Sequence, residues 1–420
     1  MLYLRIDSRV RAAYSRTAFA MITKHLWSLH HISKTVISPK TILCLRLLGG
    51  QYSKICSNRL VCAVTAVYCI AFSCYAPVQI LILLAQSFTP TFVQSTAAVT
   101  IFLSSALTSF WYPEYFQIFQ NDMAAIDIVL RGKSELDIPL TRVLLIAVVV
   151  SHVSTIVPFA INGVMEGRAE FQISKFLFVA YFVLQNGITY LMAVMVFEIL
   201  WYRVRKFREH LENCLPRVCR AQDVQAATED ICKCLQLYQN ILKAFKKTNV
   251  PIKIAILTAT AASFFKVIAG VFELITSSST HVSIFSYSDK VERIVHHIKV
   301  LRIHEAVLDS VLPLTPALLA ALIQGELNRI KLFIGNLILN AKGEHYSAYD
   351  TARLCPLIFN KRKHESVHDA LCDCQLYLEH RPFRYSVWRL FTVDLSLVIS
   401  VINLYVTSLI AMIQFGHFYN

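Results

Sequence analysis

Residues 391–415 read FTVDLSLVISVINLYVTSLIAMIQF, and this stretch decides the fold class. Its only charged side chain is Asp394, and the 21 positions that follow are mostly apolar, with a few hydroxyl and amide side chains. A helix needs about 20 mostly apolar residues to cross the hydrocarbon core of a bilayer. The stretch therefore predicts a membrane-spanning α-helix.

The same pattern recurs upstream, so the sequence predicts an all-α membrane protein with seven transmembrane helices. Hydrophobic residues make up 55% of the chain and charged residues 16%, with a mean hydropathy of +0.51, whereas soluble domains carry about 25% charged residues. No repeat or linker divides the chain, so we expect one transmembrane channel domain over 60–420 after an N-terminal segment 1–59. The predicted spans are 60–84, 92–112, 140–161, 174–201, 251–275, 303–323 and 391–415.

Lys and Arg are distributed unevenly between the segments that these spans separate. Segments 1–59, 113–142, 202–253 and 324–389 hold 34 of the 41 basic residues, whereas the alternate segments hold six. Because basic connecting segments stay in the cytosol, we expect a cytosolic N-terminus and an extracellular C-terminus. Membrane orientation thus explains the net charge of +14, and the expected surroundings are a lipid bilayer with no nucleic-acid partner.

The two longest basic segments, 202–250 and 324–389, also show the pattern of amphipathic helices. Apolar residues recur three or four positions apart among charges, for example from Leu327 to Leu337. Such helices either extend the spans into the cytosol and pack together, or lie on the membrane surface. The narrow apolar stripes favour packing, so we expect cytosolic helical anchor extensions.

The seventh predicted span carries a single polar stripe. Ser396, Ser400, Asn403, Thr407 and Gln414 are spaced 4, 3, 4 and 7 residues apart, which puts them on one helical face. Lipid cannot satisfy such groups, so the stripe must face protein or water. Two interpretations remain open: the stripe lines a pore shared by several copies of the chain, or it binds the helix to its neighbours.

The C-terminal 40 or so residues resemble a known family. The run LYLEHRPFRYSVWRLFTVDLSLVISVINLYVTSLIAMIQF looks like the C-terminal signature of insect gustatory receptors, which ends in Thr-Tyr, five apolar residues and Gln-Phe. Here Thr407, Ser408, LIAMI, Gln414 and Phe415 match it, with Ser408 in place of the Tyr. The segment SPKTILCLRLLGG at 38–50 also resembles the family's N-terminal stretch.

The resemblance implies a ligand-gated cation channel in the plasma membrane of chemosensory neurons, without enzymatic activity or cofactor. It implies a homo- or hetero-tetramer with related receptor subunits, opened by a small-molecule tastant. Leu409 follows Ser408 where sugar-sensing members tend to carry Glu, which favours a bitter or other non-sugar compound. An odorant receptor channel of the same superfamily is the near alternative. The expected pore-lining residues are Ser400, Asn403, Thr407, Gln414 and Phe415.

The same layout implies a ligand-binding pocket among the outer halves of the third to sixth spans. An ionisable residue within a span is costly and faces a cavity or a partner. We therefore expect Lys266 to pair with Glu305 or Asp309, either at the pocket or in a purely structural role. The candidate ligand-binding residues are Phe159, Asn162, Tyr181, Gln185, Lys266, Glu305 and Asp309.

One motif favours a different class of protein. His364-Glu365-Ser-Val-His368 matches H-E-x-x-H, in which two His bind zinc and Glu acts as the base of a peptidase. The basic residues 361–363 precede it where such enzymes bury the helix in apolar surroundings, so a membrane zinc peptidase is the less favoured alternative and no metal site is expected. Cys232-Lys-Cys234 and Cys372-Asp-Cys374 lack zinc-site spacing and are interpreted as ordinary reduced thiols.

Overall fold

The fold is described from a computed structural model, which describes residues 38–54, 58–85, 90–130, 138–165, 173–220, 224–280, 289–351 and 358–418. The first elements are α2 (Pro39–Leu48), α3 (Arg59–Ala85), α4 (Pro90–Trp111), α5 (Tyr115–Val129), α6 (Pro139–Met165) and α7 (Ile173–Arg220). They are followed by α8 (Val224–Lys247), α9 (Asn249–Thr280), α10 (Asp289–Thr351) and α11 (Ile358–His380). A hairpin of β1 (Ser386–Val387) and β2 (Phe391–Thr392) leads into α12 (Leu395–Phe418).

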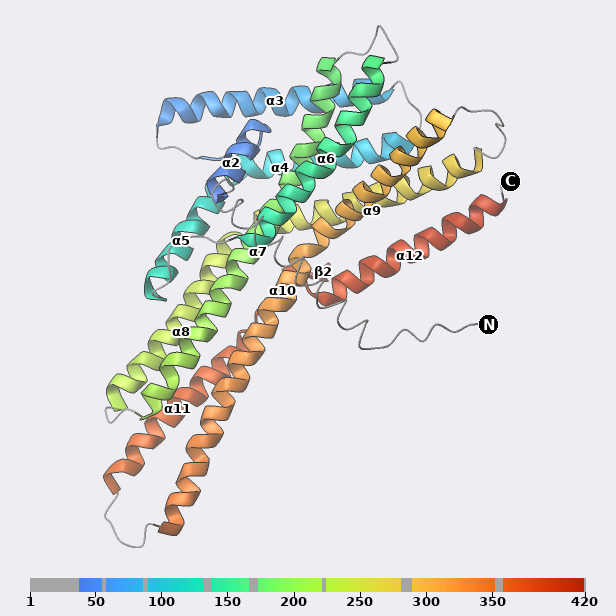
Figure 1. Cartoon of the computed structure of the whole chain (residues 1–420). Coiled ribbons are helices and arrows are strands. Elements are labelled where there is room, and N and C mark those ends of the chain that lie inside the picture. The colour runs from blue at the N-terminus through green and yellow to red at the C-terminus, as the bar shows by residue number, and fades with distance from the viewer. Residues whose placement is uncertain are drawn as a thin grey trace, which may run out of the picture.

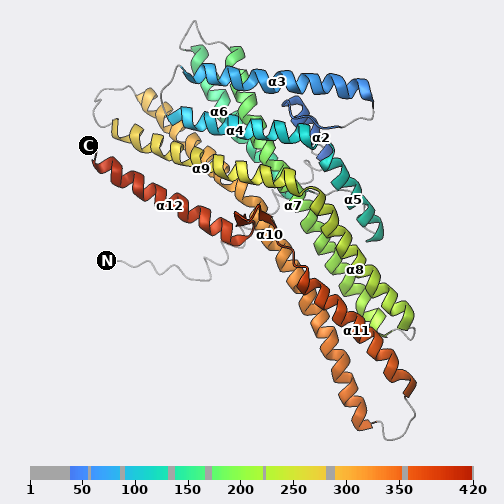
Figure 2. The same ribbon diagram turned by 180° about the vertical axis from the view of Figure 1, so that it is seen from behind.

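Two long helices, α7 and α10, run through the molecule and organise it (Figure 1). At one end they pack with α6 and α9, and α4 covers α9. At the other end their continuations form a limb with α8 and α11, while α12 runs separately beside α9 and α10, as Figure 2 shows from behind. The all-α architecture predicted from the sequence is confirmed.

A helix lies over most of each of the seven predicted spans. Within the described residues, five stretches are long and apolar enough to cross a membrane: Arg59–Gln79, Leu184–Leu215, Asn249–Phe272, Val307–Leu339 and Leu395–Gln414. Two further apolar stretches, Thr96–Trp111 and Pro139–Ser151, are shorter. The chain is therefore a multi-pass membrane protein, while the count of seven and the orientation stay predictions.

Helix α7 lies at the centre because it is apolar on nearly every side. All residues from 185 to 200 are buried. Gly187 permits the close approach of α6: a Cβ added there would lie 2.6 Å from Val148 Cγ1. Between residues 185 and 200 this packing leaves α7 no exposed stripe, so the sequence there does not show which side meets which neighbour.

The helices of the limb pack against one another, as their narrow apolar stripes predicted. The Phe207 and Tyr238 rings of α7 and α8 stack with centroids 6.2 Å apart, and the Tyr238 hydroxyl donates to the Arg381 carbonyl at 2.9 Å. On α10, Ile330 and Ile334 are fully buried. Helix α10 continues unbroken from Asp289 to Thr351, so it runs through the predicted span 303–323 into the predicted cytosolic segment 324–389.

Candidate functional site

Helix α12 is held to its own chain along one face, which packs against α9 and α10. Leu397 and Val401 are buried there, and Tyr405, Ser408 and Met412 are half-buried. Their spacing of three or four residues puts them on one side of the helix. We call this side the packed face of α12.

The predicted polar stripe lies on a different side of α12. Its members, all exposed, are Ser396, Ser400, Asn403, Thr407 and Gln414. They follow a line about 130° around the helix from the packed face. The exposed stripe therefore does not bind α12 to the other described helices of its chain. The Thr407 hydroxyl donates to the Asn403 carbonyl at 2.8 Å, whereas the exposed amides of Asn403 and Gln414 need water or another chain. The side chain of Phe415 lies outside the part of the chain that the structure describes.

The hairpin before α12 and a capping carboxylate determine where α12 begins. Residues 391–392 form β2, so the predicted start of the last span at 391 is corrected to Leu395. Asp394 Oδ1 accepts a hydrogen bond from Ser396 N at 2.9 Å, and Oδ2 accepts one from the Thr392 hydroxyl at 2.9 Å. Hydrogen bonds from Ser396 and Thr392 lower the pKa of Asp394, which keeps this cap ionised.

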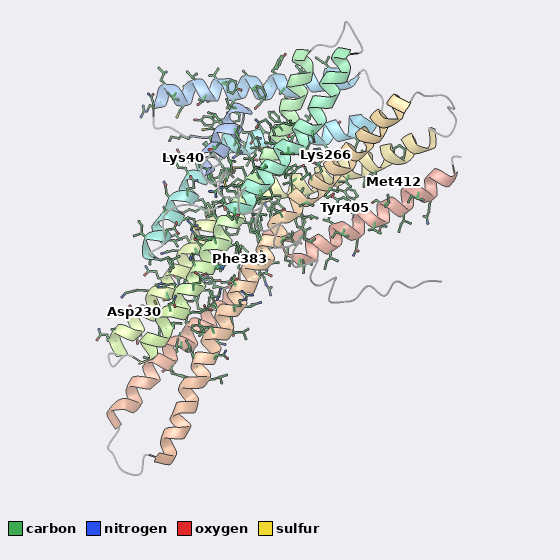
Figure 3. All side chains as sticks on the ribbon, viewed as in Figure 1. Lys40, Asp230, Lys266, Phe383, Tyr405 and Met412 are labelled. Atoms are coloured by element: carbon green, nitrogen blue, oxygen red, sulfur yellow. The ribbon has the colours of Figure 1, made fainter. Side chains whose placement is uncertain are left out.

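A buried ion pair joins α9 to α10. Lys266 Nζ lies 3.3 Å from both carboxylate oxygens of Asp309, and the two side chains are only 10% and 16% exposed. Of the two predicted partners of Lys266, Asp309 is the one found, and the Glu305 side chain lies outside the described residues. Figure 3 shows Lys266 where α9 and α10 run together, with Tyr405 on the adjacent α12.

Three further residues around this ion pair were not predicted from the sequence. Ser263 of α9 donates to the backbone carbonyl of Asp309, and its oxygen lies 3.1 Å from the Tyr405 hydroxyl of α12. Tyr190 of α7 is buried close to Asp309 and Tyr405, and its hydroxyl has no hydrogen-bond partner among the described residues. We call Tyr190, Ser263, Lys266, Asp309 and Tyr405 the four-helix cluster, since it connects α7, α9, α10 and α12.

The fold of this chain is found in solved structures of known proteins. No family model matches the sequence, and no curated protein matches it. Two solved structures of the olfactory receptor OR5 from the insect Machilis hrabei do match in three dimensions. The structure in complex with eugenol gives a TM-score of 0.54 at 12% identity, over 93% of this chain and 98% of that chain. The second OR5 structure gives 0.53 at 14% identity, over 92% and 99%. The chain has the fold of an insect olfactory receptor.

In this olfactory-receptor fold the candidate ligand-binding residues do not all meet at the four-helix cluster. Gln185 is buried against the turn after α2, where a Cβ added to Gly49 would lie 2.0 Å from Gln185 Oε1. It points about 140° around α7 from Tyr190. The side chains of Phe159, Asn162 and Tyr181 lie outside the described residues. The sequence thus found the Lys266–Asp309 pair but not the direction of Gln185.

The H-E-x-x-H motif lies on α11, in the limb of the olfactory-receptor fold. The side chains of His364 and Glu365 lie outside the described residues, and the His368 ring is 3.8 Å from Cys372 Sγ. Among the side chains that the structure describes, no group of three potential ligands could hold a metal ion. The two OR5 structures that share this fold are of a receptor and not of an enzyme.

The two Cys-x-Cys pairs each place one thiol outward and one inward. Cys232 is exposed and Cys372 half-buried, whereas Cys234 and Cys374 are buried. Burial raises the pKa of Cys234 to about 12 and that of Cys374 to about 11. The nine cysteines whose side chains the structure describes are free thiols.

Proposed function

We propose that this chain is one subunit of a ligand-gated cation channel in which α12 lines the pore. The observation that carries the proposal is the exposed polar stripe of α12. A hydroxyl such as that of Thr407 can donate within its own helix, but amides that a spanning helix turns away from its own chain, here Asn403 and Gln414, need water or another chain to satisfy them. A water-filled pore bordered by further copies of α12 supplies both.

A single α12 cannot surround a pore, so we propose a tetramer of this chain or of this chain with related receptor subunits. Each subunit would present Ser400, Asn403, Thr407 and Gln414 to the pore, with Phe415 at its outer end. Their hydroxyl and amide oxygens would replace part of the hydration shell of a passing cation. The proposed setting is the plasma membrane of a chemosensory neuron, with the N-terminus in the cytosol.

The proposed ligand is a small-molecule tastant, bitter or otherwise not a sugar. Thr407, Gln414 and Phe415 match the gustatory signature, and Leu409 follows Ser408. Detection of an odorant is the second candidate, favoured by the fold shared with an olfactory receptor solved in complex with eugenol. The nature of the effective ligand separates the two roles.

We propose that the ligand binds among the outer parts of α6, α7, α9 and α10. A charged side chain of an ion pair among membrane-spanning helices can give up part of its contact with its partner and bind a polar group of a ligand. This favours Lys266 and Asp309 as ligand-binding residues. Gln185, which faces the α2 side of α7, is a weaker candidate. The remaining members of the proposed site are Phe159, Asn162, Tyr181 and Glu305.

The test is the current carried by the full chain in a non-neuronal cell. Plant alkaloids, sugars and eugenol are applied in turn while surface protein is measured. A cation current evoked by alkaloids supports the gustatory role, and one evoked by eugenol alone supports the odorant role. Surface-localised protein that responds to no compound, together with a particle in detergent that lacks fourfold symmetry, would overturn the channel proposal.

Two stripe variants test the pore itself. Asn403→Asp adds a carboxylate per subunit to the pore wall, so it should increase permeability to divalent cations, and Gln414→Ala should change the unit conductance. Ile413→Val is the matched control, because Ile413 is 45% exposed and lies off the stripe. Unit conductance and selectivity equal to those of the unmodified chain in both stripe variants would refute the assignment of α12 to the pore.

A further inference from the structure

A proline in α10 leaves one backbone carbonyl open for a contact with another helix. Pro313 lies inside α10, and a proline has no N–H to donate to the carbonyl four residues earlier. That carbonyl belongs to Asp309. Buried in a membrane, such a carbonyl requires a donor from another group.

Ser263 of α9 supplies this donor and thereby becomes an acceptor for α12. Its hydroxyl donates to the Asp309 carbonyl, so its one hydrogen is engaged. The Tyr405 hydroxyl lies 3.1 Å from the Ser263 oxygen and also bonds to Ser310 of α10. Because the hydrogen of Ser263 is engaged, Tyr405 is the donor and the Ser263 oxygen the acceptor of the bond between them. A hydrogen-bonded chain therefore runs from α10 through α9 to α12.

Neighbouring side chains hold both ends of this series of hydrogen bonds in place. Lys266 fixes the Asp309 side chain through the ion pair. The Tyr405 ring stacks on Phe264 with centroids 5.8 Å apart and planes 17° apart. Asp309, Ser263 and Tyr405 thus belong to one arrangement, and moving α12 breaks its last bond.

Tyr405 lies at the level of the polar stripe and on the opposite side of α12. It is ten residues, or about 15 Å, from the first residue of the helix. Asn403 and Thr407 flank it in sequence, and both point away from the packed face. A shift of Tyr405 across the packed face therefore moves Asn403 and Thr407 by a similar amount.

We propose that Tyr405 is the positioning residue through which α9 and α10 control α12, by its bond to Ser263 on the Asp309 carbonyl that Pro313 leaves free. This inference rests on the proposed channel function. Changes at α9 and α10 reach the stripe through this contact. The hydrogen bond affects the equilibrium between channel conformations, while the pore wall itself is unchanged.

The test is a double-mutant cycle on ligand-evoked current. Tyr405→Phe and Ser263→Ala each remove one end of the bond, so each should shift the half-activating ligand concentration about two- to tenfold. The double variant should shift it no further than the larger single change. Ser263→Thr keeps a hydroxyl at this position, so its half-activating ligand concentration should equal that of the unmodified chain. The unit conductance should be the same in all of these variants.

Pro313→Ala and Thr258→Val complete the set. Alanine at 313 offers an N–H to the Asp309 carbonyl, competes with Ser263, and should shift activation in the same direction as Ser263→Ala. Thr258 of α9 donates to Ile254 within its own helix, so Thr258→Val is the control without an effect on gating. Additive effects of the two single changes, or loss of surface protein as their only effect, would overturn the proposal.

A second measurement does not depend on current. A cysteine placed by Met412→Cys, on the half-buried packed face, should react with a methanethiosulfonate reagent about two- to tenfold faster when Tyr405→Phe is added. Mass spectrometry of that peptide gives the rate. Faster reaction without any channel current means that the contact holds α12 but the channel function is wrong. An unchanged rate in a conducting channel refutes the positioning role alone.

Discussion

The Glu198 carboxylate of α7 closes the beginning of α6, and Glu198→Ala tests how these two helices are held together. Its oxygens accept hydrogen bonds from the N–H groups of Leu140 at 2.6 Å and Thr141 at 2.8 Å, and from the Thr141 hydroxyl at 2.6 Å. Helix α6 starts with Pro139, which has no N–H, so Glu198 meets the first two donors of the helix. Glu198 is 1% exposed, and water has little access to replace it.

The expected loss follows from these contacts. Hydrogen bonds to a charged acceptor contribute about 1.5–3 kcal/mol each, and a negative charge beside a helix N-terminus adds about 0.5 kcal/mol. Removing the carboxylate from two buried N–H groups should therefore lower the free energy of unfolding by about 4 kcal/mol. With an unfolding entropy near 2 cal/mol/K per residue over 420 residues, Tm should fall by about 5 °C.

The assay is thermal unfolding of the purified chain in detergent, and α7 provides the control. Glu209, on the same helix, is 35% exposed and pairs with Arg205 and Lys206. Because exposed ion pairs contribute about 1 kcal/mol or less, Glu209→Ala should lower Tm by about 1 °C at most. Equal shifts for the two variants would refute the view that Glu198 caps α6.

Three further predictions concern separate parts of the molecule. Asp394→Ala removes the cap of α12, so amide exchange at the first turn of α12 should be about fivefold faster, equivalent to about 1 kcal/mol. Because the pKa of Asp394 is lowered, the unmodified chain should lose this stabilisation only as the pH falls below the usual carboxyl value of about 4. Gly187→Ala should lower the free energy of unfolding by about 1–3 kcal/mol, since its Cβ meets Val148, whereas Gly325→Ala, whose Cβ meets nothing within 4 Å, should leave it equal or higher. Iodoacetamide at pH 8 should label Cys232 in the native protein and leave the buried Cys234 unlabelled until it unfolds, because burial raises the pKa of Cys234 to about 12; equal labelling would contradict its burial.

The sequence predicted the features of this fold that have few alternatives in a membrane. A charged side chain in an apolar span accepts only a few partners, so the order of residues alone limits Lys266 to Asp309 or Glu305. The polar stripe of α12 was equally visible, because every other side of that helix is almost wholly apolar. Both predictions rest on the high free energy of placing a polar group in lipid.

The contacts of hydroxyl groups could not be predicted from the sequence, because a hydroxyl in a span has many possible partners. Within a helix, Thr258 donates to Ile254 and Ser104 donates to Ile101, so a hydroxyl in a span finds a partner in its own helix without a neighbour. Nothing in the spacing of Ser263 separates it from these cases. The direction of Gln185 could not be predicted for a similar reason, because α7 is buried on all sides from 185 to 200 and its apolar pattern there specifies no direction. The available signal for Ser263 was Pro313, four residues after Asp309, which indicates an unpaired carbonyl but not its donor.

Ser408, which replaces the Tyr of the gustatory signature, lies on the packed face of α12. It is half-buried toward α9 and α10. Tyr405 lies one turn earlier on that face, with its hydroxyl on Ser263 and its ring on Phe264. Tyr405 thus places an aromatic hydroxyl between α12 and its neighbours at the level of Asn403 and Thr407. Because Tyr405 bonds to Ser263 of α9, substitutions at Tyr405 should alter gating more strongly than substitutions at Ser408.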